Sequence, residues 1–334
     1  MSKLFMAGVL GSLLAASQLV AGSNTVAGAT TNPPPVTVPD ANDPVEKEYK
    51  KLLEDDDDAQ AEVDQWIRDN DAAAAKGAGV PSADLRLRIR DRFAPIRQAY
   101  EDFLKRHPDH ARARIAYGSF LNDVQDEDGA REQWEKALAL NPKDPAVYNN
   151  LANLYGQIGP VKKAFEYYAK AIELNPQEPL YYHNFGDTVY LFRKDAMEFY
   201  GLTEQQVYDK ALQLYSKALK LDPRNFPLAS DAAQTYYGIK PLRTEDALKA
   251  WTNTLALAHD EIEREGVYLH LARIKLAAER FAEARAHLAA VTNDLYDVLK
   301  KRLTRNLDEQ ERKAKETNAP PPVQTREGER PREP

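Results

Sequence analysis

The side chains best suited to metal or acid–base chemistry are a few histidines and one dense acidic run. His107 and His110 have a spacing that could put two imidazoles on one helix face, but Pro108 separates them and no third ligand accompanies them. We expect a loop or surface role for both. The acidic run, Glu54 followed by Asp55–Asp58, lacks the spaced ligands and the turn glycine of a calcium loop. We therefore expect a solvated acidic segment and predict no metal and no cofactor.

Signatures of other catalytic chemistry are missing from the sequence. There is no cysteine, which removes thiol nucleophiles, zinc fingers and disulfides together. There is also no nucleophile motif, phosphate-binding glycine loop or zinc-hydrolase motif. The formal net charge is −7, without a basic stripe, which argues against nucleic acid as a partner. These observations predict that the protein is not an enzyme and that its function lies on a surface.

The elements that must form this surface come from a repeat in the middle of the chain. The segments Ala137–Pro145, Ala171–Pro179 and Ala218–Phe226 share one pattern; the first two begin 34 residues apart and the third begins 47 further on. Steps of three and four residues share one helix face, and proline stops a helix. Each block is therefore predicted to be a helical hairpin. Small residues recur in two columns, at Gly118, Ala152, Gly186, Ala233 and Ala272, and at Ala130, Ala164, Ala211, Ala247 and Ala284.

This pattern resembles the tetratricopeptide repeat (TPR) family, and the second block matches it best, with Tyr148, Leu151, Ala152, Tyr155, Ala164, Tyr168, Ala171 and Pro176 in place. We place five units, at 111–144, 145–178, 179–225, 226–264 and 265–298. The resemblance implies an all-α fold, a TPR-like α-solenoid in which antiparallel helix pairs stack into a right-handed superhelix. It also implies a protein or peptide partner, because this family serves as a scaffold.

The first helices of such hairpins line a concave groove, so the resemblance implies a peptide-binding site there. Its predicted residues are Asn149, Asn150, Asn153, His183, Asn184, Asp187, Asp231, Gln234, Tyr237 and Arg273. Asparagine side chains both donate and accept hydrogen bonds, which suits the backbone of an extended peptide. The alternative is that the asparagines are simply the usual residues of this repeat.

The third unit differs from the others by a 13-residue insertion between its predicted helices, within Tyr190–Thr203. Thr203 and Gln206 predict a capping box that starts the next helix. Aromatic residues and methionine are favoured at interface cores, so the insertion could contact a partner. The alternative is that it folds back over its own repeat. Its apolar residues are Met197, Phe199, Tyr200 and Leu202.

The first 22 residues read as an export signal, with Lys3, the apolar stretch Leu4–Ala16 and small-residue cleavage sites. The alternative is an uncleaved inner-membrane anchor at residues 4–20, which would be the only contact with a membrane. Val20–Ser23 resembles the bacterial lipoprotein box, but Ser23 stands where the lipid-bearing cysteine must be, so we predict no lipid anchor. The expected location is the periplasm or cell envelope.

The remaining segments flank the repeats. We expect a proline-rich linker at 23–43, an N-terminal helical segment and cap at 44–110, a capping helix at 299–317 and a disordered tail at 318–334. Within 44–110 we expect a helix to Asn70, a flexible link over Asp71–Ala83, and a half-repeat whose second helix begins near Pro95. The C-terminal apolar positions expected to cover the last hairpin are Leu295, Val298, Leu299, Leu303 and Leu307.

Together these features predict a non-enzymatic interaction scaffold, or adaptor, of a bacterial cell envelope that holds a protein or peptide in its groove. The alternative function is a substrate-recognition accessory subunit of an enzyme complex. The sequence leaves the oligomeric state open.

Overall fold

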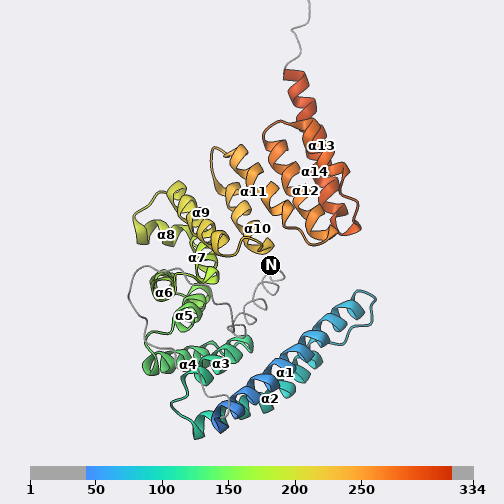
Figure 1. The fold of residues 1–334 in the computed structure, drawn as a ribbon. Helices are drawn as coiled ribbons and strands as arrows, with labels where there is room; N and C mark the ends of the chain where they lie inside the picture. The colour runs from blue at the N-terminus through green and yellow to red at the C-terminus, as the bar shows by residue number, and fades with distance from the viewer. Residues whose placement is uncertain (1–42, 318–334) are drawn as a thin grey trace, which may run out of the picture. The chain divides into compact units, whose positions relative to one another are not determined.

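The computed structural model describes residues 43–317, and this part of the chain is all-α (Figure 1). By its internal contacts the chain divides into Met1–Glu48 and Tyr49–Pro334. Only 43–48 of the first unit is described, so the account below concerns the second. The expected signal or anchor at 1–22, the linker before residue 43 and the tail at 318–334 lie outside the described residues. Among the helices that are described, none is long and apolar enough to cross a membrane.

The helices follow one another along the chain with short connections. They are α1 (Pro44–Ala74), α2 (Ser82–Arg106), α3 (Ala111–Asp123), α4 (Glu127–Leu140), α5 (Pro145–Ile158), α6 (Val161–Leu174), α7 (Pro179–Leu191), α8 (Arg193–Tyr200), α9 (Glu204–Leu221), α10 (Phe226–Gln234), η2 (Thr235–Gly238), α11 (Thr244–Ala256), α12 (Glu261–Ala277), α13 (Phe281–Ala289), η3 (Asp294–Tyr296) and α14 (Asp297–Thr317).

The helices pair as hairpins that contact their neighbours in chain order. The pairs are α3–α4, α5–α6, α7–α9, α10–α11 and α12–α13, and the second helix of each pair contacts the first helix of the next (Figure 1). This is the contact pattern of a solenoid, in which each unit buries its apolar face against the next one. The fold is an all-α tetratricopeptide-type solenoid, as the repeat predicted.

The proline-containing segments between the pairs begin the next helix. Asp144 Oδ1 accepts a hydrogen bond from the Ala146 N–H at 3.0 Å, and Pro145 occupies the first turn of α5. Asn225 Oδ1 accepts from the Leu228 N–H at 2.9 Å at the start of α10. Proline suits this first turn because its missing N–H would have no partner there. The repeated turns therefore fix where each first helix starts.

The columns of small residues mark where the two helices of a hairpin approach each other. A Cβ built on Gly186 of α7 would lie 2.8 Å from the Tyr215 ring on α9, and one on Gly118 of α3 would lie 2.4 Å from Trp134 Nε1 on α4. No side chain fits these positions without a shift of the ring. Gly156 of α5 is different, since its Cβ would meet only Thr188, at 3.8 Å.

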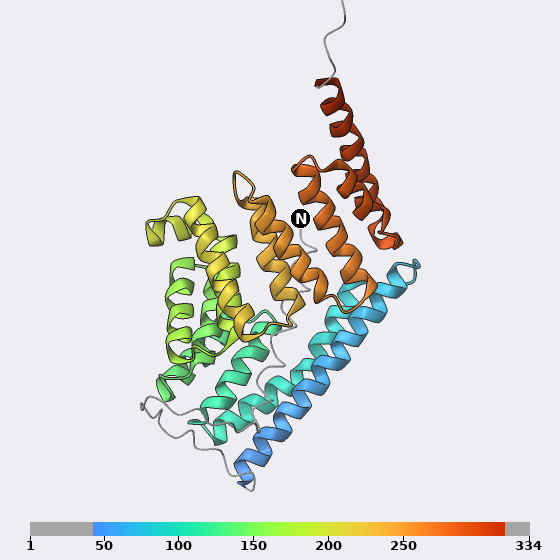
Figure 2. The same cartoon turned by 45° about the horizontal axis from the view of Figure 1, so that its top comes forward.

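The N-terminal helices form one more hairpin, and the expected break near Pro95 is wrong. α2 runs through Pro95 as one helix, because burial of Ile96 and Tyr100 on the following turn outweighs the hydrogen bond that proline removes. Its partner is α1, which lies beside it (Figure 2). Arg88 lies over the Trp66 ring at 3.6 Å, and this pairing reduces the expected flexible link to residues 75–81.

The acidic run is not simply solvated, since Asp56 is buried in this hairpin. The Tyr100 hydroxyl donates to Asp56 Oδ2 at 2.7 Å, and burial raises the pKa of Asp56. The Tyr100 ring stacks on Tyr117 of α3 at 5.1 Å, much as Tyr168 of α6 stacks on Phe185 of α7 at 5.3 Å. α2 therefore acts as the second helix of a unit that precedes the five predicted ones.

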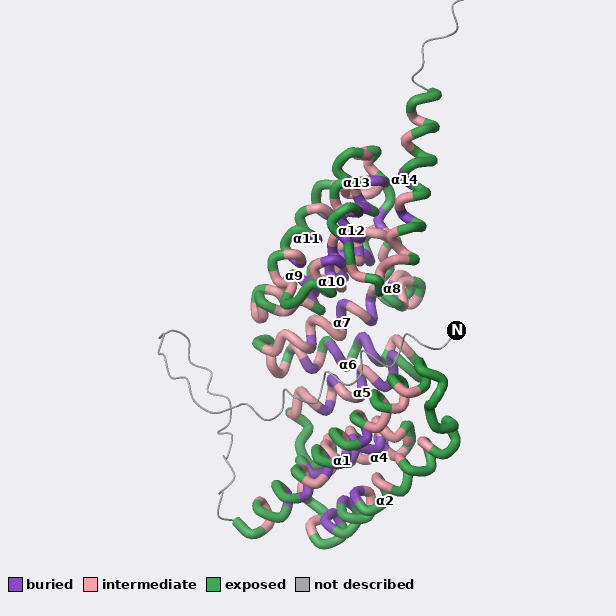
Figure 3. Tube along the Cα trace, turned by 90° about the vertical axis from the view of Figure 1, so that its right-hand side faces the viewer, coloured by how far each residue is buried: buried purple, intermediate pink, exposed green. Residues whose placement is uncertain are grey.

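α14 covers the last hairpin with only part of the expected apolar face. Leu303 and Leu307 are buried in a cluster with residues of α12 and α13, whereas Leu295 and Val298 remain 68% and 84% exposed. The chain first turns through η3, so the buried face begins only at Leu299. The opposite face of α14 is exposed along most of its length (Figure 3).

The two glycines predict opposite effects of the same substitution. Gly186→Ala should lower the free energy of unfolding by about 1–3 kcal/mol, because the new methyl group overpacks the Tyr215 ring. Gly156→Ala should raise it by up to about 1 kcal/mol, because alanine favours the helix and its methyl group finds space. Urea denaturation followed by circular dichroism measures both. Equal effects of the two substitutions would contradict the close approach at Gly186.

Candidate functional site

The residues predicted for the binding face lie on successive first helices. Together with His270 of α12 we call them the first-helix row: Asn149, Asn150 and Asn153 on α5, His183, Asn184 and Asp187 on α7, Asp231 and Gln234 on α10, Tyr237 on η2, and Arg273 on α12. Most are half-buried. Side-chain hydrogen bonds join them across the hairpins, so the row is polar and connected rather than apolar.

Between the second and third hairpins these bonds are made by neutral groups. Asn184 Nδ2 donates to Asn149 Oδ1 at 3.1 Å across the junction, and within the second hairpin the Tyr168 hydroxyl donates to Asn153 Oδ1 at 2.6 Å. Asn149 is only 4% exposed. The structure thus places Asn149 inside the junction, where it takes part in packing, and leaves Asn150 at the more accessible edge.

Between the third and fourth hairpins the same positions carry titratable groups. His183 Nε2 lies 2.9 Å from Asp231 Oδ2 and 3.5 Å from Asp187 Oδ2. The Tyr215 hydroxyl donates to Asp187 Oδ1 at 2.7 Å, and Gln234 Nε2 donates to Asp231 Oδ1 at 3.4 Å. Two carboxylates and one imidazole therefore converge on one point of the row.

Burial and charge shift the titration of this cluster. Burial raises the pKa of Asp187 to about 6, and the nearby Asp231 charge acts in the same direction against the His183 and Tyr215 contacts. Burial alone would lower the pKa of His183, but the hydrogen bond to Asp231 and the two carboxylate charges outweigh it and raise that pKa above its usual value. The cluster favours a proton, or another cation, between its members.

The C-terminal part of the row is built around Trp251. His270 stacks on the Trp251 ring at 4.0 Å, and its Nδ1 lies 2.9 Å from the Tyr237 hydroxyl. Burial, with the nearby Arg273 charge, lowers the pKa of His270 to about 4, so this imidazole is neutral at physiological pH. Arg273 lies over the Tyr237 ring at 4.3 Å and is exposed. It is the cation that the row presents to solvent at this end.

The insertion is a helix rather than a loop. α8 ends at Gly201 in a left-handed conformation, and the predicted Thr203–Gln206 capping box starts α9. Phe199 and Tyr200 lie 5.5 and 5.6 Å from the Phe165 ring of the preceding hairpin.

These contacts favour the covering alternative for the insertion. α8 contacts both α6 and α9 and covers the junction between the second and third hairpins. Met197, Tyr200 and Leu202 are half-buried, and Phe199, at 36%, has an exposed face left.

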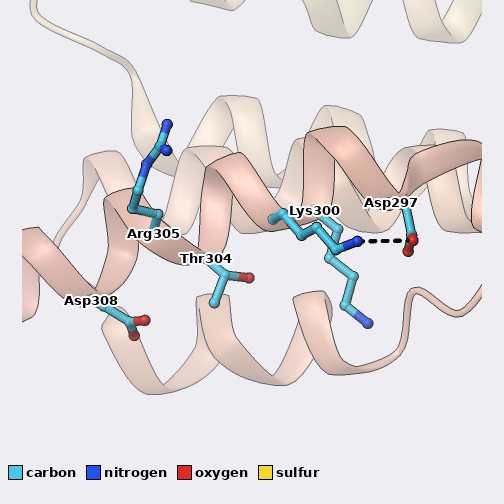
Figure 4. A pocket seen from close by; sticks show the side chains of 6 residues that line it. Asp297, Lys300, Thr304, Arg305 and Asp308 are labelled. Carbon is cyan, nitrogen blue, oxygen red and sulfur yellow. Dashed lines mark hydrogen bonds and ion pairs between the residues drawn. The ribbon is translucent and has the colours of Figure 1, made fainter.

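Two further candidates lie outside the row. A hollow of about 430 Å³ runs along α14, lined by Asp297, Lys300, Lys301, Thr304, Arg305 and Asp308 (Figure 4). All these side chains come from one helix, and Lys301 is paired with Asp297 at 3.2 Å, so the hollow is a solvated helix face. His110 Nδ1 accepts from the Ala113 N–H at 3.0 Å as the N-cap of α3, a structural role.

The sequence placed His183, Asp187 and Asp231 on one face but did not predict that they meet. The repeat itself could have predicted this contact. Positions 183 and 231 are equivalent to positions 149 and 184 of the preceding junction, so a side-chain bond at one junction implies a bond at the other. The sequence also did not predict that the Tyr168 and Tyr215 hydroxyls donate to residues of the row.

The family models that match this chain agree with this architecture. Family models described as TPR repeat and tetratricopeptide repeat match residues 125–159 and 145–178. No curated protein matches the sequence. Among solved structures, MamA is 21% identical, with 58% of this chain and 91% of that chain covered and a TM-score of 0.40. YrrB, described as a TPR protein with an unusual peptide-binding site, is 13% identical (65% and 99% covered, TM-score 0.48). PilW, described as a type IV pilus biogenesis factor, is 17% identical (63% and 91% covered, TM-score 0.49).

The titratable junction predicts a pH dependence of stability. Because the pKa values of Asp187 and His183 are both raised, the folded chain holds protons that the unfolded chain has released, and stability falls as pH rises from about 4 to above 6.5. Asp187→Asn keeps an acceptor for Tyr215 and removes the buried charge. Its unfolding free energy relative to wild type should therefore rise with pH, by about 1 kcal/mol or less, since 37% of the Asp187 side chain is exposed and screened.

Urea titrations with EDTA between about pH 4.5 and 7.5 measure this difference. The control is Glu166→Gln, which removes an exposed carboxylate of α6 and should give a flat difference. A difference for Asp187→Asn that stays constant or falls with pH would show that the surroundings of Asp187 do not raise its pKa.

Proposed function

Because the chain is a tetratricopeptide repeat protein, an interaction scaffold by architecture, we propose that it binds an extended peptide segment of a protein partner along the first-helix row. The single observation that carries this proposal is the continuity of hydrogen-bonding side chains over α5, α7, α10 and α12. An extended peptide exposes backbone N–H and C=O groups at regular intervals, and a row of amides, carboxylates and hydroxyls can pair with both kinds.

The hydrogen bonds within the row support a division between residues that hold it together and residues that we propose bind the partner. Asn153 and Asp187 accept bonds from the tyrosines of their own hairpins, so they are chiefly structural. Arg273 is exposed, Asn150 is half-buried, and Gln234, also half-buried, donates to Asp231 of its own helix. We assign the contacts with the partner to these three, with Tyr237 as the aromatic surface beside Arg273.

Two further parts of the proposed function come from the sequence alone. We propose that the protein acts without catalysis, since the row holds no nucleophile motif. We also propose that it is exported to the cell envelope, because residues 1–22 resemble a leader. Cell fractionation with an antibody against the repeats tests the location separately from binding.

A triple variant tests the binding face. Asn150→Ala, Gln234→Ala and Arg273→Ala together should weaken capture of the partner from an extract of the source cells at least tenfold. The melting temperature should be almost unchanged, because none of the three residues is deeply buried.

A control variant changes one residue on the second helix of each of three hairpins, with Glu166→Ala on α6, Lys217→Ala on α9 and Asn253→Ala on α11, all exposed. Capture should survive these changes. Undiminished capture by the first variant, or equal loss with both, would place the partner elsewhere.

A further inference from the structure

The cluster at the junction between the third and fourth hairpins has the geometry of a metal site. His183 and Asp187 lie one turn apart on α7, and Asp231 comes from α10. One nitrogen or oxygen from each of them lies within 4.8 Å of the others. Ligand atoms around a tetrahedral zinc ion, at bond lengths near 2.0–2.1 Å, are about 3.3 Å apart. The distances of 3.5 and 2.9 Å from His183 Nε2 to the two carboxylates bracket this value.

The outer hydrogen bonds orient the ligand atoms. Tyr215 donates to Oδ1 of Asp187, and Gln234 donates to Oδ1 of Asp231. Both bonds leave the Oδ2 atoms turned toward His183 Nε2. Metal sites characteristically hold their carboxylates by such secondary contacts, which fix the direction of the free oxygen.

The repeat supplies an internal comparison. The preceding junction has counterparts of two of these bonds, a 3.1 Å bond between first helices and a 2.6 Å bond from the second-helix tyrosine. There all three groups are neutral amides, so the solenoid does not require charge at these positions. The equivalent residues are Asn149 for His183, Asn153 for Asp187 and Asn184 for Asp231.

A bound cation would compensate the negative charge of the two carboxylates at this junction. Two half-buried carboxylates lie beside one imidazole, with their Oδ2 atoms 3.5 and 2.9 Å from its Nε2. A divalent ion would neutralise both carboxylates and bind the neutral imidazole. The set of one nitrogen and two oxygens suits Zn²⁺ or Mn²⁺ better than Mg²⁺ or Ca²⁺, which prefer oxygen ligands alone.

We propose that His183 Nε2, Asp187 Oδ2 and Asp231 Oδ2 bind one divalent transition-metal ion, with Zn²⁺ the best match. The three side chains are 17%, 37% and 38% exposed, so the remaining coordination position opens to water. This site does not depend on whether the first-helix row binds a peptide.

Calorimetric titration of the chelator-treated full chain with ZnCl₂ tests the proposal. We expect one ion per chain with a dissociation constant on the order of micromolar or tighter, binding of MgCl₂ at least 100-fold weaker, and a higher melting temperature with Zn²⁺. Absence of a one-to-one Zn²⁺ or Mn²⁺ complex would overturn the proposal.

The preceding junction suggests which substitutions to test. His183→Asn, Asp187→Asn and Asp231→Asn together reproduce its three asparagines, so the variant should keep its helical circular dichroism and no longer bind the ion. If the triple variant is unstable, Asp231→Asn alone should weaken binding at least tenfold. His259→Ala removes an exposed histidine that pairs with Glu263 at 3.0 Å and should leave Zn²⁺ binding intact. Binding that survives the amide substitutions, or that is lost with His259→Ala, would place the ion elsewhere.

Discussion

The structure depends on one repeated interaction between the two helices of a hairpin. A tyrosine or tryptophan of the second helix fills the space above a small residue of the first, as Tyr215 does above Gly186 and Trp134 above Gly118. Where the ring is tyrosine, its hydroxyl donates to an acceptor on the partner helix, at Asn153 or Asp187. Ring packing sets the distance between the helices, and the hydroxyl bond sets their rotation, because a buried hydroxyl must be paired.

The same interaction appears in the N-terminal hairpin, where Tyr100 donates to Asp56 of α1. As a consequence, the polar residues of the first helices fall into two groups. Residues of the first group hold the solenoid together, and their replacement would destabilise the fold before it weakened binding. Residues of the second group, such as Asn150 and Arg273, lie beside them and do not bond to the second-helix tyrosines. Substitutions in the second group can therefore change binding specificity while the first group keeps the helices in place.

Much of the fold could be predicted because its causes are local. The 34-residue spacing, the small columns and the proline turns each act within one hairpin, and family models match the best-preserved part. The errors fell where distant segments compete with local signals. Pro95 predicts a helix start, but packing of α2 against α1 keeps the helix continuous.

The candidate site was predictable only in part for a related reason. Helix periodicity assigns Asp187 and Asp231 to the right face, but whether their oxygens meet depends on how two hairpins are rotated against each other. Burial of Asp56 in an acidic run depends likewise on a tyrosine 44 positions away. Val298 is the opposite case. The apolar pattern predicted that it would cover the last hairpin, but α12 and α13 offer no surface at that point and Val298 stays exposed.

The insertion helix has a consequence for how the molecule comes apart. In a chain of nearest-neighbour contacts, cooperativity is transmitted only through the junctions, so the best-sealed junction unfolds last. α8 bridges α6 and α9 and buries part of Phe199 and Tyr200 against Phe165. The amide hydrogens of α6, α7 and α9 should therefore exchange most slowly with solvent. The short helix α10 passes into a 3₁₀ turn, so its amide hydrogens should exchange faster than those of these three helices.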